Sequence, residues 1–409
     1  MMAHAFSMGL TLKYLRIKFQ YSLRTLAQKV NRSHTYLARV ESGDLSATED
    51  LLTRLEEIYG LRLTPQPADI SAWFDTLETV HQALLNADTE QIHTVNQELT
   101  RQASDFHGSS VTGEYALLMW VLNVFAEPAL KQESLDAVYW VKEIGSLASH
   151  PLNFLVWMGL SKVAFHAWHL NAALNRLDQA AHVSQHPHDR AWIFLEKANI
   201  RVHRFARQTA LEDYQKAKET FGYFNNYKRR AEADIKYDLY HRRQIHQDTV
   251  DYEALKARAQ TFLLQEVMAE VLMIEGLRAQ HLENFDHAKA CLHALDLTHP
   301  QHYFNACMVL YLEGDEDALK GLLRKRPNTY VMPRVFAHAL DFLNAKTKNA
   351  PLKVQEKALK QYLHEGLKEK LYGETRRAQY ELAKLYETHR RYKDAVHMIE
   401  SITETILNA

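Results

Sequence analysis

Cysteine, glycine and proline are all scarce in this chain of 409 residues. It contains only 2 Cys, 13 Gly and 9 Pro. The two cysteines, Cys291 and Cys307, are too few for a disulfide framework, which favours a reducing compartment and predicts a cytoplasmic protein. The low content of Gly and Pro favours long helices that are joined by short connections.

Motifs for catalysis and cofactor binding are also missing. The sequence contains no G-x-G, GK[ST], HExxH, CxxC or G-x-S-x-G. We therefore expect a protein that is not an enzyme, with no catalytic residues, no cofactor and no bound metal. His182, His186 and His188 have a spacing that suits a metal, but a surface helix end is favoured because no Cys or carboxylate pattern accompanies them.

Long apolar runs are absent as well. The longest uncharged stretch, 144–161, includes Ser, His, Pro and Asn, so we expect no membrane partner. The net charge of −1 excludes a basic field over the whole chain. Residues 1–66, however, contain nine Lys/Arg and six Asp/Glu, a net charge of +3 that favours contact with an acidic partner.

Residues 10–59 predict four short helices. The first is expected at about 10–19, with Phe19 on its apolar side, and the next two flank a break at Asn31 and Arg32. The expected N-caps are Ser22, Ser33 and Thr48, and the expected helix ends are Gly43 and Gly60. The two central helices have the layout of a helix-turn-helix, whose second helix enters the major groove of DNA.

This segment supplies the predicted DNA-binding residues. The residues expected to read bases or cap the recognition helix are Ser33, His34, Thr35, Tyr36 and Arg39. The expected phosphate contacts are Arg24, Lys29 and Arg32. Residues 12–60 resemble the Cro/repressor-type helix-turn-helix, with LxxLR near the start, S-x-x-x-LA in the second helix and RVESG ending the third. Leu23 departs from that family, which commonly has Gln at this position.

A second region follows a proline-rich connection. Thr64-Pro65-Gln66-Pro67 predicts a linker, so we expect a DNA-binding domain at 1–63, a linker at 64–70 and a repeat domain at 71–409. Small residues twelve apart, followed by an apolar residue four further on, recur five times. The sets are Ser161/Ala173/Leu177, Ala198/Ala210/Tyr214, Gly276/Ala288/Leu292, Ala306/Ala318/Leu322 and Ala383/Ala395/Ile399. This pattern resembles the tetratricopeptide repeat, which implies an all-α, right-handed superhelical array with a concave face.

The concave face of such an array is expected to bind an extended peptide. Asn199 is the central candidate because its amide both donates and accepts, and we expect it to be solvated without ligand. Aromatic neighbours would hold apolar side chains of the ligand, although packing between helices is the alternative for Trp157 and Phe165. The predicted peptide-binding residues are Trp157, Lys162, Phe165, His166, Asn199, Val202, His203, Asp234 and Tyr237.

Together the two regions resemble the peptide-pheromone regulators of Gram-positive bacteria, the RRNPP type that includes Rgg, PlcR and PrgX. The resemblance implies a cytoplasmic homodimer that binds double-stranded operator DNA and is switched by a short signalling peptide in quorum sensing. Dimerisation is expected to use apolar residues near the C-terminus, including Leu371, Tyr372, Tyr380, Tyr386 and Ile399. The alternative is a tetratricopeptide adaptor that docks a protein partner, with DNA binding secondary. A response-regulator phosphatase is a further, less favoured alternative.

Overall fold

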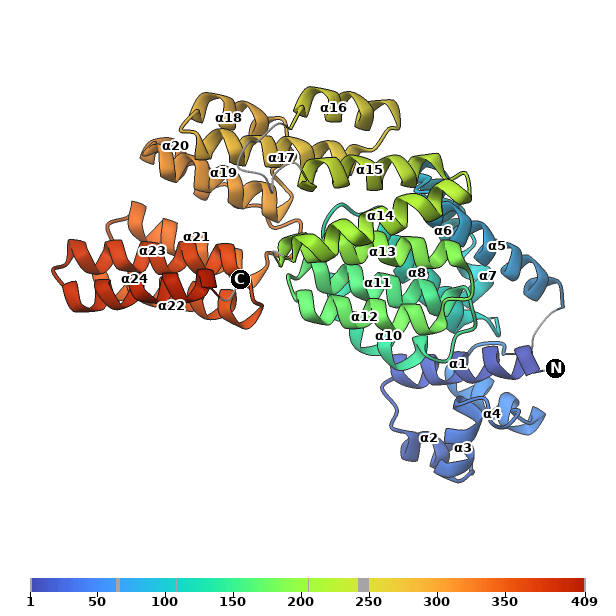
Figure 1. Ribbon diagram of the computed structural model, residues 1–409. Helices are drawn as coiled ribbons and strands as arrows, with labels where there is room; N and C mark the ends of the chain where they lie inside the picture. Colours follow the sequence, from blue (N-terminus) through green and yellow to red (C-terminus); the bar gives the residue numbers. More distant parts are fainter. Residues whose placement is uncertain (1, 64–66, 108, 205, 242–249, 408–409) are drawn as a thin grey trace. The chain divides into compact units, whose positions relative to one another are not determined.

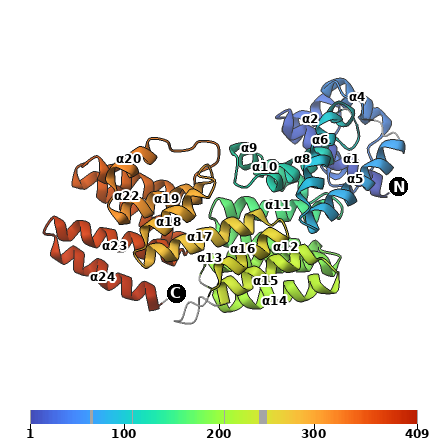
Figure 2. The same cartoon turned by 90° about the horizontal axis from the view of Figure 1, so that it is seen from above.

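The computed structural model describes residues 2–63, 67–107, 109–204, 206–241 and 250–407. Over these residues the chain forms 24 α-helices and no strand (Figures 1 and 2). The predicted all-α fold class is confirmed. Among the described helices, none combines the length and the apolar character that crossing a bilayer requires.

The first ten helices are α1 (Met2–Lys18), α2 (Leu23–Lys29), α3 (His34–Glu41), α4 (Glu49–Tyr59), α5 (Pro67–Leu85), α6 (Thr89–Arg101), α7 (Ala103–His107), α8 (Thr112–Ala126), α9 (Gln132–Asp136) and α10 (Val138–Gly145). The next seven are α11 (Leu152–His166), α12 (Leu170–Val183), α13 (Pro187–His203), α14 (Arg207–Tyr223), α15 (Tyr227–His241), α16 (Tyr252–Thr261) and α17 (Gln265–His281). The last seven are α18 (Phe285–His293), α19 (Pro300–Glu313), α20 (Glu316–Leu323), α21 (Arg334–Thr347), α22 (Leu352–Lys368), α23 (Tyr372–Thr388) and α24 (Tyr392–Leu407).

The chain divides into two compact units. The first comprises Met1–Glu127, Glu133–Val163 and Asn175–Ile193, and the second comprises Pro128–Gln132, Ala164–Leu174 and Phe194–Ala409. Residues on both sides of the predicted linker at 64–70 thus belong to the first unit. Residues 64–66 of that linker lie outside the described residues, and Pro67 already begins α5.

Helices α2–α4 begin and end where the sequence predicts. Ser22, Ser33 and Thr48 each accept a hydrogen bond from the backbone N–H three residues further on. Gly43 and Gly60 have positive φ angles of 81° and 64°, which suit residues that end helices. The shared core contains Met8, Leu12, Leu15, Leu26, Ala27, Val30, Leu37, Val40, Leu51, Leu55, Tyr59 and Leu63.

Helix α1 differs from its prediction at both ends. It begins at Met2 rather than near residue 10, because Gly9 does not interrupt it. A Cβ at Gly9 would lie only 2.6 Å from the carbonyl oxygen of Val40, so the glycine lets α1 pack closely against α3. At the other end α1 stops at Lys18, one residue before Phe19, which is 40% exposed while its ring packs on the core residue Tyr59 with ring centres 4.9 Å apart.

The opposite side of α1 packs against α8 and α10 (Figure 1). Thr11 Oγ1 donates a hydrogen bond to the carbonyl of Ser110 and accepts one from Gly113 N at 3.1 Å. Lys13 Nζ donates to the carbonyl of Glu143 at 2.9 Å. Thr11 is fully buried. Helix α1 therefore belongs both to the small N-terminal core and to the helices that follow it in the first unit.

A buried polar cluster also ties the first unit together. His81 Nε2 on α5 and His150 Nε2 lie 2.9 and 3.1 Å from the two carboxylate oxygens of Asp189, in the first turn of α13. Burial raises the pKa of the Asp189 carboxyl, but the hydrogen bonds from the two histidines outweigh burial and hold this pKa below its ordinary value. The carboxylate thus links two helices that are distant in sequence.

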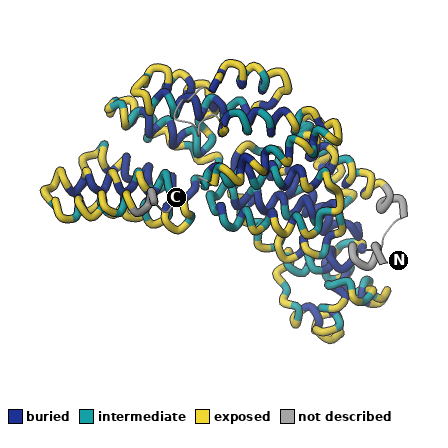
Figure 3. Tube along the Cα trace, in the orientation of Figure 1, coloured by how far each residue is buried: buried dark blue, intermediate teal, exposed yellow. Residues whose placement is uncertain are grey.

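Paired helices recur in the second unit, with buried positions concentrated between neighbours (Figure 3). In the set Gly276/Ala288/Leu292, a Cβ at Gly276 would lie 3.2 Å from the Cβ of Cys291, so α17 and α18 require a small residue there. The members of Ala198/Ala210/Tyr214 are all fully buried. The first set confirms the predicted close approach of paired helices, and the second set takes buried positions as predicted.

Other repeat predictions are wrong at single positions. Ala318 is exposed, because Leu319 rather than Ala318 faces the neighbours of the short helix α20. Ile399 does not take the buried repeat position, because the adjacent face of α24 packs through Ala395. Its exposure of 56%, like that of 52% for Tyr380, agrees with the expectation of exposed apolar residues near the C-terminus. Two residues predicted to be exposed, Leu371 and Tyr386, are buried.

The contact between α1 and α8 predicts a large effect of one added methyl group. In Gly113→Ala the new Cβ would lie 2.5 Å from Leu10 Cδ2 and 3.0 Å from Thr11 Cα, so the two helices must separate. We expect a loss of about 1–3 kcal/mol in the free energy of unfolding, measured by urea titration. Gly321→Ala in α20 is the matched control, because its Cβ meets nothing within 4 Å. The control should be neutral or up to about 1 kcal/mol more stable, and equal effects of the two substitutions would contradict the packing.

Candidate functional site

Helix α3 presents a polar face away from the N-terminal core. His34, Thr35 and Arg39 are exposed, as expected for residues that read bases. Tyr36 differs from them, because it is half-buried against the core and its hydroxyl oxygen is buried. The Arg32 guanidinium lies 5.9 Å from the centre of the Tyr36 ring. The exposed face thus consists of the Ser33 cap, His34, Thr35 and Arg39.

The predicted phosphate contacts lie on α2 and the turn after it. Arg24 and Lys29 are exposed on α2, and Lys29 Nζ lies 5.4 Å from the centre of the Tyr21 ring. Arg32 forms an exposed ion pair with Asp50, with an N–O distance of 2.7 Å. Arg32 must therefore leave the Asp50 carboxylate before it can reach a phosphate, whereas Arg24 and Lys29 are already at the surface.

A buried ion pair fixes α3 against α1. Arg16 donates from Nε to Glu41 Oε1 at 2.6 Å and from Nη2 to Glu41 Oε2 at 2.8 Å. Glu41 is buried, and a bidentate pair of this kind also fixes the relative orientation of its two helices. Arg16 ends the LxxLR motif and Glu41 lies in the RVESG motif. The two motifs were recognised in the sequence, but the ion pair between them was not predicted.

The predicted ligand residues fall in both units. Trp157 and Lys162 belong to the first unit, where both are half-buried and Lys162 Nζ lies 5.2 Å from the centre of the Phe125 ring. The other seven belong to the second unit. Among these, Val202 is buried rather than available at a surface, because its side chain packs inside the helix layers.

Three ligand candidates form an aromatic cluster at the junction of α11 and α12 with α13. The Phe165 ring centre lies 5.4 Å from that of His203 and 5.8 Å from that of His166. Trp168, which the sequence analysis missed, lies 5.3 Å from His203. Burial lowers the pKa of His203, so the imidazole favours its neutral form in this environment.

Two further candidates on α15 have partners within the chain. Asp234 forms ion pairs with Lys218 and Arg258. The Tyr237 ring stacks on that of His241, with ring centres 5.2 Å apart. A ligand that contacts Asp234 would therefore have to compete with two cations.

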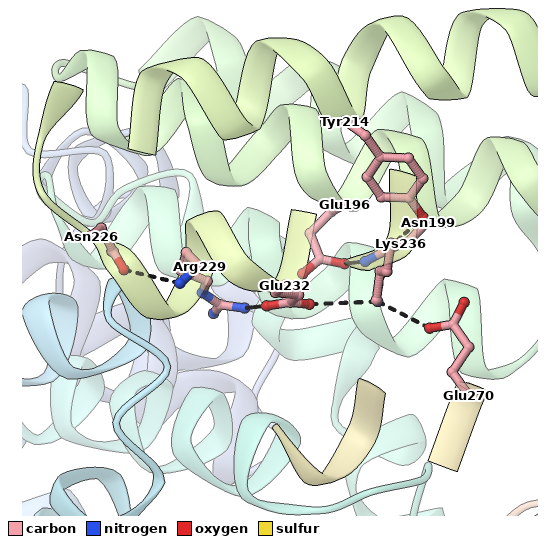
Figure 4. Close-up of polar contacts among 8 residues, drawn as sticks. All are labelled: Glu196, Asn199, Tyr214, Asn226, Arg229, Glu232, Lys236 and Glu270. Carbon is pink, nitrogen blue, oxygen red and sulfur yellow. Dashed lines mark hydrogen bonds and ion pairs between the residues drawn. The ribbon is translucent and has the colours of Figure 1, made fainter. Parts of the chain in front are cut away.

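Asn199 is half-buried and hydrogen-bonded, so the prediction that it is solvated is wrong (Figure 4). Its Oδ1 accepts hydrogen bonds from the Tyr214 hydroxyl at 2.9 Å and from Lys236 Nζ at 3.0 Å. Its Nδ2 donates to Glu196 at 3.2 Å. Glu196 lies three residues before Asn199 on α13, whereas α14 and α15 bring Tyr214 and Lys236 to it, which no local pattern in α13 could reveal.

The contacts of Asn199 extend into a buried network of charges on α15 and α17 (Figure 4). Lys236 Nζ lies 3.2 Å from Glu270 and 3.5 Å from Glu232, and Arg229 lies 2.8 Å from Glu232. Burial lowers the pKa of Lys236, but the carboxylates around it outweigh burial and raise this pKa above its ordinary value. Sequence reasoning missed these residues because charges three and four apart on a helix usually mark a solvated face.

The network limits what Asn199 can offer to a ligand. An asparagine amide has two acceptor positions on oxygen and two donor hydrogens on nitrogen. Contacts among the described residues use both acceptor positions and one donor. The second N–H of Asn199 is the position left for a ligand, and its complement is a carbonyl oxygen.

A separate cavity lies against α21 and α22. It is lined by His338, Lys353, Glu356, Lys357, Lys360, Gln361, His364 and Glu365. None of the predicted ligand residues lines this cavity. The cavity and the hydrogen-bonded network around Asn199 therefore lie on different helices of the second unit.

Sequence comparison identifies the N-terminal domain. The family model HTH_3, described as helix-turn-helix, matches residues 12–65. The chain therefore contains a helix-turn-helix domain that comprises the C-terminal part of α1 and all of α2–α4. A search of curated protein sequences gave no match.

Solved structures share the helical fold. The crystal structure of a Rap protein complexed with competence and sporulation factor is 11% identical and covers 84% of this chain and 99% of that chain, with a TM-score of 0.59. The apo form of the quorum sensor NprR from B. thuringiensis is 14% identical, covers 82% and 99%, and has a TM-score of 0.46. The likeness to the Rap protein shows that the chain has the same helical-repeat fold.

The contacts of Asn199 predict a stability effect. Asn199→Ala removes the acceptor of the buried Tyr214 hydroxyl and one of the oxygens around Lys236 Nζ. We expect a loss of about 1–3 kcal/mol in the free energy of unfolding, measured by urea titration. Asn344→Ala on the exposed face of α21 is the control and should change this free energy by less than about 0.5 kcal/mol. Equal stability of both variants would support the original prediction of a solvated Asn199.

Proposed function

We propose that this protein is a cytoplasmic, homodimeric transcription regulator that binds operator DNA through α3 and is switched by a short signalling peptide. The exposed polar face of the capped, rigidly held helix α3 is the observation that carries the proposal. The proposed function involves no enzymatic activity. It is the function of the RRNPP-type regulators that the sequence resembles.

Three features support DNA binding. The N-terminus of α3 is fixed by the Ser33 cap, and its C-terminal end is fixed by the Arg16–Glu41 pair. His34, Thr35 and Arg39 then project from a rigid support, which direct contacts to base edges require. Lys29 and Arg24 on α2 supply positive charge beside that face for the phosphate backbone.

Peptide binding is supported by the second unit. The Rap protein of similar fold is complexed with competence and sporulation factor. In this chain Phe165, His166 and His203 form the aromatic cluster described above, and the second N–H of Asn199 suits a main-chain carbonyl of an extended peptide. We propose that these four residues contact the peptide, with Tyr237 beside them on α15.

Dimerisation is proposed through the C-terminal helices. Tyr392, Val396 and Ile399 are exposed at spacings of four and three residues along α24, so they share one face. A second copy would cover this apolar stripe, and a dimer would place two α3 helices on a two-fold symmetric operator.

The DNA-binding role is tested with a site selected from random duplexes and used in fluorescence anisotropy at matched salt. Arg39→Ala should cost at least about 1 kcal/mol on the selected site, because a base contact is lost. Lys29→Ala should weaken selected and random duplexes alike and reduce the salt slope by about one.

Arg101→Ala on the exposed face of α6 removes the same charge outside the helix-turn-helix and is the control. Its affinity for the selected site should equal that of the parent chain. If Arg39→Ala binds the site as tightly as this control, α3 does not read the operator.

The ligand role is tested by native mass spectrometry of the full chain purified from its source organism. We expect the mass of a short peptide on the parent chain. Asn199→Asp keeps an acceptor for Tyr214 and Lys236, removes both amide N–H donors and places a second carboxylate beside Glu196, so it should lose the peptide. Circular dichroism checks that this variant is folded. Asn344→Asp is the charge-matched control and should retain the peptide. Equal peptide occupancy in the two variants would exclude Asn199 from the ligand site.

A further inference from the structure

The second unit brings sulfur, nitrogen and oxygen atoms together between α17 and α18. Cys291 Sγ lies 3.6 Å from His287 Nε2, which lies 3.0 Å from Glu275 Oε1. Ligand atoms of the three residues all lie within 4.8 Å of one another. A tetrahedral zinc ion with bonds of about 2.0–2.3 Å separates its ligand atoms by about 3.3–3.6 Å. The side chains thus already lie close to the spacing of a metal site.

We propose that Cys291, His287 and Glu275 bind one divalent transition-metal ion, with Zn²⁺ as the cation that suits this ligand set best. Thiolate, imidazole and carboxylate are the three ligand types that zinc accepts in proteins. Three protein ligands leave the fourth tetrahedral position to water. The metal fastens α18 to α17.

The two helices hold these side chains in place. His287 and Cys291 are four residues apart on α18 and therefore lie on the same face. Gly276, next to Glu275 on α17, permits the close approach, because a Cβ there would lie 3.2 Å from Cys291 Cβ. Lys256 Nζ on α16 lies 3.1 Å from Glu275 Oε2, which leaves Oε1 directed at His287. Figure 1 shows α16, α17 and α18 as neighbours.

Charge and access also fit a cation. The Cys291 thiol is buried, whereas 48% of the His287 side chain is exposed, so an ion can enter from the histidine side. On binding, the Cys291 S–H bond breaks, its proton goes to solvent, and a sulfur–metal bond forms. His287 binds through the Nε2 lone pair with its own proton on Nδ1. One thiolate and one carboxylate then balance the two positive charges of the ion.

Ligand atoms of His81, His150 and Asp189 in the first unit also lie within 4.8 Å of one another, but this cluster is a weaker candidate for a metal site. It offers no sulfur ligand, and its one carboxylate is shared by the two histidines. His81 and Asp189 are almost completely buried, so an ion has no open approach to them. This cluster serves as a hydrogen-bonded tie between helices.

The proposal is tested by titrating the reduced, full-length chain with Co²⁺ and recording absorption. A cobalt–thiolate bond gives a near-ultraviolet charge-transfer band that histidine and carboxylate ligands do not produce. We expect this band at one equivalent of Co²⁺, its loss on addition of Zn²⁺, and its absence in Cys291→Ser. Cys307→Ser should retain the band, because the only other cysteine of the chain lies outside the site.

His287→Gln gives an independent result, because it leaves both cysteines of the chain unchanged. It should bind Co²⁺ at least about tenfold more weakly, and Zn²⁺ should raise its melting temperature less than that of the parent chain. His293→Gln on the exposed face of the same helix is the control. Cobalt bound without the thiolate band, a band that persists in Cys291→Ser, or equal affinities of the two histidine variants would each overturn the proposal.

Discussion

The hydrogen bonds of Thr11 to Ser110 and Gly113 are the contacts on which the N-terminal half depends, because they join α1 to α8. One side of α1 contributes to the helix-turn-helix core and holds α3 through the Arg16–Glu41 pair. Its other side is buried against the next helices. The position of the recognition helix is therefore set by helices that lie beyond the family match at residues 12–65.

The second unit depends instead on a buried polar network around Lys236. Burying the carboxylates of Glu196, Glu232 and Glu270 with the cations of Lys236 and Arg229 costs desolvation energy. Their mutual attraction offsets this cost only when each charge has its partner in place. The same contacts fix which faces of α13, α14, α15 and α17 meet around Asn199. A peptide carbonyl on the second N–H of Asn199, as proposed, would act on a side chain that is bonded to both α14 and α15, which gives the proposed peptide a physical means of changing the unit.

Local features of the sequence were sufficient for much of the fold. The caps at Ser22, Ser33 and Thr48 and the glycines that end helices depend on neighbouring residues, so a single sequence reveals them. Long-range contacts were not predicted. The extension of α1 depends on α3 and α8, and the bonded state of Asn199 depends on residues up to 37 positions away. The spacing of His287 and Cys291 is visible in the sequence, but Glu275 joins them only through helix packing.

The double role of α1 also bears on how such a protein can diversify. A recombination event at residue 12, where the domain match begins, would cut α1 in the middle and separate Leu10 and Thr11 from the segment that carries α3. Leu10 and Thr11 would stay against α8 around Gly113, but an incoming segment would have to continue α1 in the same helical register to keep α3 in its position. If α3 reads operator DNA as proposed, substitutions on its exposed face change specificity without disturbing this junction, whereas exchange of the whole domain must also preserve the junction.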